Sequence, residues 1–195
     1  YALKHGEWRE KYPNSGQIKE MRSSTIGLIG FGAIGRLVVG LLRPFHCCIL
    51  INDPYVPKEE IEKYGCKAVS KEELLKEADI VSLHGRIGPN DPPIIGKKEL
   101  SMMHKNSYLI NTARAVLVDM DALYEALKAH DIMGAAIDVF PKEPLPDNYP
   151  LLSLDNCTLT NHRGGDTIDS YNRAPEQLLE QFQEVLKTGS TKYMI

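Results

Sequence analysis

Short apolar runs alternate with helix-forming segments along most of this 195-residue chain. The runs expected to form strands are residues 25–29, 47–51, 67–69, 80–83, 108–110, 134–137 and 157–159. The segments with helical composition or spacing are residues 35–42, 58–64, 71–78 and 97–103, a stretch after the expected N-cap Asp119, and residues 175–186. This alternation is typical of βαβ units, which build a parallel sheet covered on both faces. The expected fold class is therefore α/β, with a doubly wound parallel sheet.

A glycine motif follows the first expected strand and opens the next helix. It has the spacing G-x-G-x-x-G and consists of Gly30, Phe31, Gly32, Ala33, Ile34 and Gly35. Gly30 permits a tight turn, Gly32 lets the backbone approach a pyrophosphate, and Gly35 lets the helix pack closely on the strand. The free N–H groups of a helix N-terminus attract phosphate. In this position the motif predicts a dinucleotide site of the Rossmann type.

Asp53 lies at the end of the second expected strand and bears on the choice of cofactor. A carboxylate at this point can accept hydrogen bonds from both hydroxyls of an adenosine ribose, and it repels a 2′-phosphate. No arginine directly follows Asp53. The sequence therefore predicts NAD as the cofactor, in preference to NADP.

The composition excludes several other classes of protein. The formal net charge is -3, which disfavours partners such as nucleic acid or an anionic membrane, because both require a basic surface. No apolar run reaches the ~20 residues of a transmembrane helix. The four cysteines form no Cys-x-x-Cys pair, so no metal site is expected. They are interpreted as reduced and mostly buried thiols of a cytoplasmic protein.

Three later segments carry polar and charged side chains directly after expected strands. They are residues 111–114, 138–144 and 160–165. In a doubly wound sheet, loops at the carboxyl ends of the strands converge on the crevice that binds the ligand. The three segments are therefore expected to meet beside the bound nicotinamide.

The ordered set of motifs resembles the D-isomer-specific 2-hydroxyacid dehydrogenases, from about Gly6 to the C-terminus. The matching segments are residues 28–35, 53–55, 81–84, 110–114, 117–119, 135–140 and 143–146, together with His162. The resemblance implies an NAD-dependent oxidoreductase that interconverts a small 2-keto acid and a D-2-hydroxy acid by hydride transfer.

By this resemblance, Arg114, Glu143 and His162 are the expected catalytic residues. A guanidinium can hold a carboxylate or keto oxygen through two parallel contacts, which a lysine cannot reproduce. A histidine can donate a proton to the carbonyl oxygen as hydride arrives, and can take it back in the reverse direction. A neighbouring carboxylate fixes the orientation of the imidazole ring.

The resemblance also implies a set of cofactor contacts. Asp138 resembles the residue that reaches the carboxamide side of the nicotinamide, whereas Thr112 and His84 resemble positions that line the dinucleotide. The full set of expected cofactor-binding residues is Gly30, Gly32, Ala33, Ile34, Gly35, Asp53, His84, Thr112, Ala113, Asp138 and Gly164.

The sequence departs from the family pattern at several positions. Ala115 and Val116 stand where glycines are usual, and Asn161 stands where proline is usual before the histidine. Arg163 replaces a small or apolar residue, and Arg86 lies in a segment that commonly has Leu-Pro. The two arginines suggest the hypothesis of an anionic or phosphorylated substrate.

Family members carry most of a substrate-binding domain before the glycine motif. Residues 1–165 are therefore expected to form the dinucleotide-binding domain, beginning with a linking helix, and residues 166–195 a helix that returns toward a substrate domain largely absent from this chain. Turnover by this chain alone is expected to be weak, because part of the cleft wall is missing. A homodimer is expected, as in the family, with residues 1–21 as part of the contact.

Three alternatives remain beside this interpretation. An NAD(H)-sensing interaction protein of the corepressor type could use the same scaffold and keep Arg114, Glu143 and His162. Formate dehydrogenase is disfavoured, because that branch has an amide where Glu143 stands. A methyltransferase with a glycine-rich first loop gives the later catalytic set no role.

Overall fold

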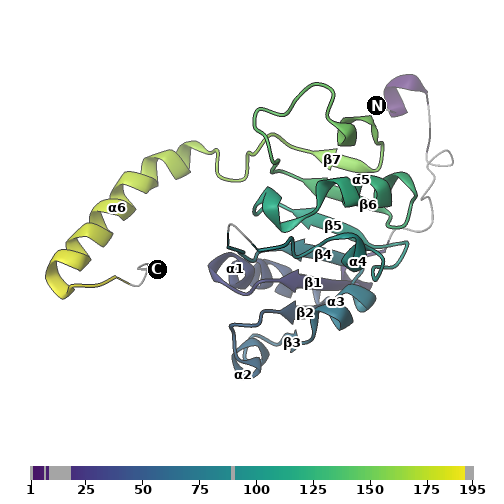
Figure 1. Ribbon diagram of the computed structural model, residues 1–195. Coiled ribbons are helices and arrows are strands. Elements are labelled where there is room, and N and C mark those ends of the chain that lie inside the picture. The colour runs from purple at the N-terminus through teal and green to yellow at the C-terminus, as the bar shows by residue number, and fades with distance from the viewer. Residues whose placement is uncertain (1, 7, 9–18, 89–90, 192–195) are drawn as a thin grey trace.

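The computed structural model describes residues 2–6, 8, 19–88 and 91–191, and its centre is a single parallel sheet (Figure 1). The seven strands are β1 (Thr25–Ile29), β2 (Cys48–Asn52), β3 (Lys67–Ala68), β4 (Ile80–Leu83), β5 (Tyr108–Asn111), β6 (Gly134–Ile137) and β7 (Cys157–Leu159). They lie in the order β3-β2-β1-β4-β5-β6-β7, and every neighbouring pair is parallel. The order reverses between β1 and β4, as in a Rossmann sheet, so the predicted fold class is confirmed.

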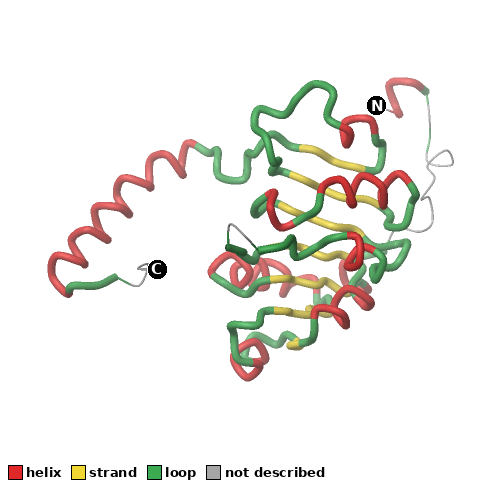
Figure 2. The backbone as a smooth tube through the Cα atoms, in the orientation of Figure 1, coloured by secondary structure: helices red, strands yellow, loops and turns green. Residues whose placement is uncertain are grey.

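Helices flank the strands on both faces of the sheet (Figure 2). The α-helices are α1 (Ala33–Leu42), α2 (Lys58–Glu62), α3 (Lys71–Glu77), α4 (Lys97–Leu100), α5 (Met120–Lys128) and α6 (Ile168–Thr188). Short 3-10 helices occupy Ala2–His5, Met21–Ser23, Arg43–Phe45, Ala115–Leu117 and Pro150–Ser153. The side chain of Asp119 accepts a hydrogen bond from Ala122 N at 3.0 Å, so the predicted N-cap of α5 is confirmed.

Two hydrophobic clusters form the core, one on each face of the sheet. Successive side chains of a strand point to opposite faces. Ile26 and Leu28 of β1 accordingly pack with Val39 of α1, whereas Ile29 belongs to the cluster that contains Leu75 of α3. The apolar runs of the sequence are continuous because both faces of the parallel sheet are buried.

The last helix is longer than the sequence pattern predicts. It begins at Ile168 because the side chain of Thr167 accepts a hydrogen bond from Ser170 N at 3.1 Å and caps the N-terminus. Pro175 lies inside the helix, although proline usually interrupts one. The start at residue 175 expected from the residue spacing was therefore wrong, because the cap lies further upstream, close to the start at residue 166 that the resemblance implies.

The cysteines are free, but they are less buried than expected. Cys66 is buried, which raises the pKa of its thiol to about 11, and Cys47 and Cys157 are half-buried. Cys48 is exposed because it is the first residue of β2, at the rim of the sheet. The expectation of mostly buried thiols was therefore wrong for Cys48.

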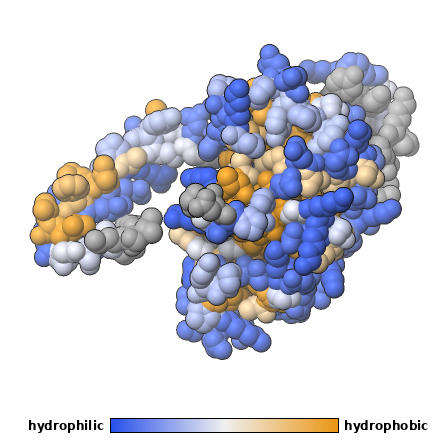
Figure 3. All heavy atoms as spheres, in the orientation of Figure 1, coloured by the Kyte–Doolittle hydropathy of each residue, from blue (hydrophilic) through white to orange (hydrophobic). Residues whose placement is uncertain are grey.

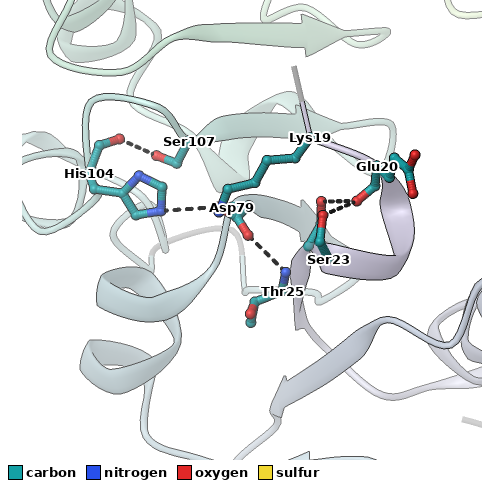
Figure 4. A network of polar contacts seen from close by, with 8 residues as sticks. Lys19, Glu20, Ser23, Thr25, Asp79, His104 and Ser107 are labelled. Atoms are coloured by element: carbon teal, nitrogen blue, oxygen red, sulfur yellow. Dashed lines mark hydrogen bonds and ion pairs between the residues drawn. The ribbon is translucent and has the colours of Figure 1, made fainter. Parts of the chain in front are cut away.

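A polar network at the amino-end edge of the sheet ties the segment before β1 to the domain (Figure 4). The Asp79 carboxylate accepts hydrogen bonds from Lys19 Nζ at 2.6 Å and from Thr25 N at 2.9 Å, and His104 Nε2 lies 3.8 Å away. Burial favours a raised pKa for Asp79, but these contacts outweigh it and lower the pKa. The predicted linking helix lies mostly outside the described residues, and the described Ala2–His5 is a 3-10 helix.

Helix α6 extends away from the sheet and its helices (Figure 1). None of the described residues of α6 is buried. Apolar side chains gather on this helix in Figure 3, and its exposed large apolar residues are Ile168, Tyr171, Leu178, Leu179, Phe182, Val185 and Leu186. None of the helices in the described part of the chain combines the length and the hydropathy of a membrane-spanning segment.

Candidate functional site

The glycine motif forms a tight turn between β1 and α1, and its three glycines meet different surroundings. Gly30 has φ +101°, and a Cβ there would lie 2.4 Å from the backbone N of Gly85. A Cβ on Gly35 would lie 2.5 Å from the carbonyl oxygen of Gly30. A Cβ on Gly32, by contrast, would meet nothing within 4 Å. Gly30 and Gly35 thus serve the fold, whereas Gly32 leaves space open in front of the helix.

The N-terminus of α1 faces this space with unused hydrogen-bond donors. Gly32 is the N-cap and provides no side-chain cap. In the described part of the chain, no hydrogen bond uses the N–H groups of Ala33, Ile34 or Gly35. Such groups, together with the helix dipole, form a site for the phosphates of a dinucleotide. The geometry of the turn therefore fits an NAD pyrophosphate.

Asp53 follows β2 and lies beside the glycine turn. Its Oδ2 accepts a hydrogen bond from Phe31 N at 2.7 Å, and its Oδ1 accepts one from Tyr55 N at 2.9 Å. A carboxylate has about four acceptor sites, so each oxygen keeps capacity for a ribose hydroxyl. The position of Asp53 thus fits the expected contact with the adenosine ribose.

Next to the turn is a pocket of about 580 Å³ at the carboxyl ends of β4 and β5. Its lining includes five residues predicted for the site, Ile34, His84, Thr112, Ala113 and Arg114, and also Gly85, Arg86, Ile87, Val116 and Leu117. Residues of α1, of the loop after β4 and of the turn after β5 therefore meet here, whereas no residue of the segments 138–144 and 160–165 lines this pocket.

His84 is the most enclosed ionisable group of this pocket. Burial lowers the pKa of its imidazole, so the neutral ring is favoured. Ser82 Oγ lies 3.0 Å from His84 Nε2 and forms a hydrogen bond with it. A neutral ring with one nitrogen engaged can still exchange a hydrogen bond with a ligand through the other nitrogen.

Arg114 is held by the turn after β5. Its side chain is exposed, and Nη1 donates to the Ala113 carbonyl at 2.7 Å. The buried Asn111 braces the turn, because its Nδ2 donates to Arg114 O at 2.9 Å and its Oδ1 accepts from Ala113 N at 3.1 Å. In the part of the chain that the structure describes, no acidic group pairs with Arg114. Its guanidinium is thus available for an anionic ligand.

The bracing role of Asn111 was not predicted. Asn111 belongs to the loop segment 111–114 that was singled out from the sequence, but no role was expected for it. Its position at the end of an apolar strand, directly before the turn, is the signal that could have identified it.

Glu143 and His162 form a close pair after β6 and β7. His162 Nδ1 lies 2.8 Å from Glu143 Oε2, and Glu143 Oε1 accepts a hydrogen bond from Phe140 N at 2.9 Å. The hydrogen bonds from His162 and from Phe140 N lower the pKa of Glu143. Glu143 is therefore held as a carboxylate, and it fixes one nitrogen of the His162 ring.

Asp138 lies directly after β6 and is only 4% exposed. Its Oδ1 accepts hydrogen bonds from Thr160 Oγ1 at 2.5 Å and from Arg163 N at 3.0 Å, and its Oδ2 accepts one from Gly164 N at 3.2 Å. Burial favours a raised pKa, but these hydrogen bonds outweigh it and the pKa of Asp138 is lowered. The structure thus places Asp138 in contact with the loop that carries His162.

The structure does not place Arg114 and His162 in one pocket. His162 lines two pockets, one with Glu143 and one with Asp166, and neither includes Arg114. Their strands, β5 and β7, are separated by β6 alone, so two strand spacings of about 4.8 Å lie between them. A bound substrate and nicotinamide would have to bridge this interval.

Comparison with known proteins gives a consistent family match. The family model "D-isomer specific 2-hydroxyacid dehydrogenase, NAD binding domain" matches residues 1–164. The chain is 42% identical over 188 residues to D-3-phosphoglycerate dehydrogenase of Methanocaldococcus jannaschii, covering 95% of this chain and 35% of the relative. It is 35% identical over 180 residues to glyoxylate reductase of Korarchaeum cryptofilum, covering 91% of this chain and 54% of the relative. The chain thus spans about half the length of these relatives, or less.

Solved structures agree with the sequence relatives. D-lactate dehydrogenase with NAD+ from Lactobacillus jensenii superposes with a TM-score of 0.83 at 30% identity, covering 100% of this chain and 61% of that one. The glycine turn, the free N–H groups of α1 and the position of Asp53 fit the same cofactor. The chain therefore belongs to the D-isomer specific 2-hydroxyacid dehydrogenase family, and it carries the NAD-binding domain of that family.

Proposed function

We propose that this chain contributes to NAD-dependent interconversion of a 2-keto acid and a D-2-hydroxy acid, with Arg114, Glu143 and His162 as catalytic residues. The observation that carries the proposal is the His162–Glu143 pair at 2.8 Å, on the same sheet edge as Arg114 and the glycine turn. Relatives described as D-3-phosphoglycerate dehydrogenase and glyoxylate reductase support the same reaction class.

In this mechanism, each residue has a separate task. When it is bound, the cofactor would accept the hydride as NAD+ during oxidation and donate it as NADH during reduction. Arg114 holds the substrate carboxylate through its unpaired guanidinium. His162 takes the hydroxyl proton during oxidation and returns it to the keto oxygen during reduction, through the ring nitrogen that Glu143 leaves free. Glu143 keeps the ring in the orientation that transfer requires.

The cofactor contacts complete the proposal. Ala33, Ile34 and Gly32 are assigned to the pyrophosphate, and Asp53 to the adenosine ribose. The other expected contacts come from the pocket beside the turn and from the segments after β6 and β7, and they are His84, Thr112, Ala113, Asp138 and Gly164.

The test compares binding with turnover. Titration of NAD and NADP into the chain is expected to give binding of NAD and much weaker binding of NADP. NADH oxidation by the complete gene product is then measured on a panel of small 2-keto acids. NADH binding without turnover of any of these acids would contradict the enzyme proposal and favour an NAD(H)-sensing interaction protein.

A matched pair of variants isolates His162. Both His162 (φ 57°) and His130 (φ 54°) have left-handed backbone conformations, which asparagine tolerates well. His162→Asn is expected to lower kcat by a factor of about a hundred or more, whereas His130→Asn is expected to leave it unchanged. Equal activity of the two variants would contradict the proposed role of His162.

The substrate is proposed to carry a second anionic group. Arg86 lines the same pocket as Arg114, and neither forms an ion pair with any residue that the structure describes. Arg163 instead pairs with Asp166 at 3.0 Å. Arg86→Ala is expected to lower kcat/KM for a phosphorylated acid by about tenfold relative to its unphosphorylated analogue, whereas Arg163→Ala is not. No preference for phosphorylated acids in the unmodified protein would contradict this proposal.

The domain division and the oligomeric state are proposals as well. Residues 1–165 are proposed to form the dinucleotide-binding domain, and 166–195 to contact a substrate domain. A homodimer is proposed, and light scattering after size exclusion tests it, with a monomeric mass as the contradicting result.

A further inference from the structure

His162 has an unusual backbone conformation. Its φ is 57°, in the left-handed region that residues with a Cβ rarely adopt. In the described part of the chain, His46 and His130 are the other two non-glycine residues with positive φ. A residue keeps such a conformation only when the surrounding structure enforces it.

Asp138 makes these contacts, and its partners precede and follow His162 in the sequence. Thr160 precedes His162 and donates its hydroxyl to Asp138 Oδ1 at 2.5 Å. Arg163 N and Gly164 N follow His162 and donate to Oδ1 and Oδ2 at 3.0 Å and 3.2 Å. One carboxylate thus closes the loop around His162, and we call these three hydrogen bonds the Asp138 clamp.

The clamp is anchored in the sheet. Asp138 N donates to Asn111 O at 3.0 Å, which ties it to the end of β5. Thr160 N donates to Ile137 O at 3.0 Å, which ties it to the end of β6. The carboxylate itself is almost wholly buried, and its three donors keep it ionised, so it acts only as an acceptor. The position of His162 is therefore set from two neighbouring strands.

We propose that Asp138 and Thr160 are positioning residues, whose clamp holds His162 in its left-handed conformation so that the ring reaches both Glu143 and the substrate oxygen. This inference rests on the proposed function for its effect on turnover. Asp138 would then act through the backbone of the 160–164 loop, in addition to any contact with the nicotinamide. No role was expected for Thr160 from the sequence. Because its hydroxyl takes part in the clamp, a substitution at Thr160 disturbs the clamp and leaves Asp138 in place for any contact with the nicotinamide.

The decisive variants are at Thr160. Thr160→Val removes the hydroxyl and keeps the shape, whereas Thr160→Ser restores the hydroxyl. Thr158→Val is the matched control, because Thr158 is an exposed residue of β7 whose side chain forms no hydrogen bond within the described residues. In the complete gene product, Thr160→Val is expected to lower kcat by about ten- to a hundredfold with little change in KM for NADH. Thr160→Ser and Thr158→Val are expected to retain kcat.

A second measurement keeps the test independent of turnover. Amide hydrogen exchange of Arg163 and Gly164, measured in this chain, is expected to quicken in Thr160→Val and to stay unchanged in Thr158→Val. If the unmodified protein turns over no 2-keto acid, the proposed function fails, while exchange still tests the clamp. Unchanged exchange at both amides overturns the clamp. A Thr160→Val variant with a raised KM for NADH and an unchanged kcat also overturns it, because the role would then be cofactor binding.

Discussion

His162 Nδ1 lies 2.8 Å from Glu143 Oε2, and the other oxygen of Glu143 accepts the Phe140 N–H. One carboxylate thus connects the ring that follows β7 to the backbone that follows β6. The pair is on the surface, so its value for stability is small. Its value is geometric, because it engages Nδ1 and leaves Nε2 as the ring nitrogen for the proposed substrate contact.

Glu143→Gln is expected to lower kcat by about a hundredfold, because the amide keeps the size of the side chain but loses the charge that holds the ring. The pKa of Glu143 is lowered in the folded chain by its hydrogen bonds, so its negative charge is fully present above the ordinary carboxyl pKa and is lost as the pH falls through the lower folded value. Steady-state kinetics against pH measure this. Asp147→Asn, at an exposed residue of the same loop, is the control, and equal loss in both variants would contradict the prediction.

Substitutions at two glycines of the turn are expected to have different effects, one on cofactor binding and the other on stability. Gly32→Ala should weaken NAD binding and leave Tm nearly unchanged, because its Cβ would enter open space. Gly35→Ala should lower the free energy of unfolding by about 1–3 kcal/mol, because its Cβ would overlap the Gly30 carbonyl. Calorimetry for NAD binding and denaturant unfolding give the two quantities.

Gly40→Ala is the control for these glycine variants. Gly40 is an exposed residue of α1, and a Cβ there would meet nothing within 4 Å. The substitution is expected to raise stability by about 0.5–1 kcal/mol through helix propensity, without an effect on NAD binding. Weaker NAD binding in Gly40→Ala would show that the assay reports helix changes in general.

Asp79→Asn is expected to destabilise the domain by about 1–3 kcal/mol at neutral pH, through loss of charged hydrogen bonds from Lys19 and Thr25. The pKa of Asp79 is lowered in the folded state, so the unfolded state binds more protons in acid. The contribution of Asp79 to stability is thus fully present above the ordinary carboxyl pKa, and it is lost as the pH falls through the pKa of Asp79 in the folded state. Urea unfolding at several pH values measures the difference between variant and unmodified chain, which should shrink in acid.

Asp155→Asn is the control for Asp79→Asn, because Asp155 is exposed and forms no ion pair within the described residues. Its unfolding curve is expected to match that of the unmodified chain at each pH. A difference that persists undiminished in acid for Asp79→Asn would contradict the proposed role of its charge.

Removal of residues 166–195 is expected to leave the unfolding midpoint and the NAD affinity of residues 1–165 unchanged. The reason is that no described residue of α6 is buried, so the core loses no contact with this helix. Thermal unfolding and NAD titration of the shortened chain check this. A large fall in Tm would show that α6 belongs to the dinucleotide-binding domain.

The fold class, the strand positions and the glycine turn could be predicted from the amino-acid sequence, because hydrophobic period and glycine spacing are local properties of the chain. The sequence predicted Asp119 as an N-cap for the same reason, and the structure confirms the cap. It could not predict the Thr167 cap of α6, since a lone threonine before Ile168 has no distinguishing pattern.

The hydrogen bonds by which the loops after β5, β6 and β7 hold one another are visible in the folded chain alone. Asp138 reaches Thr160 and Gly164, and Asn111 braces Arg114, through hydrogen bonds that no sequence spacing specifies. Such contacts depend on strand order and register, which bring distant residues to one edge of the sheet. For this reason the residues that hold the site in place became visible only in the folded chain.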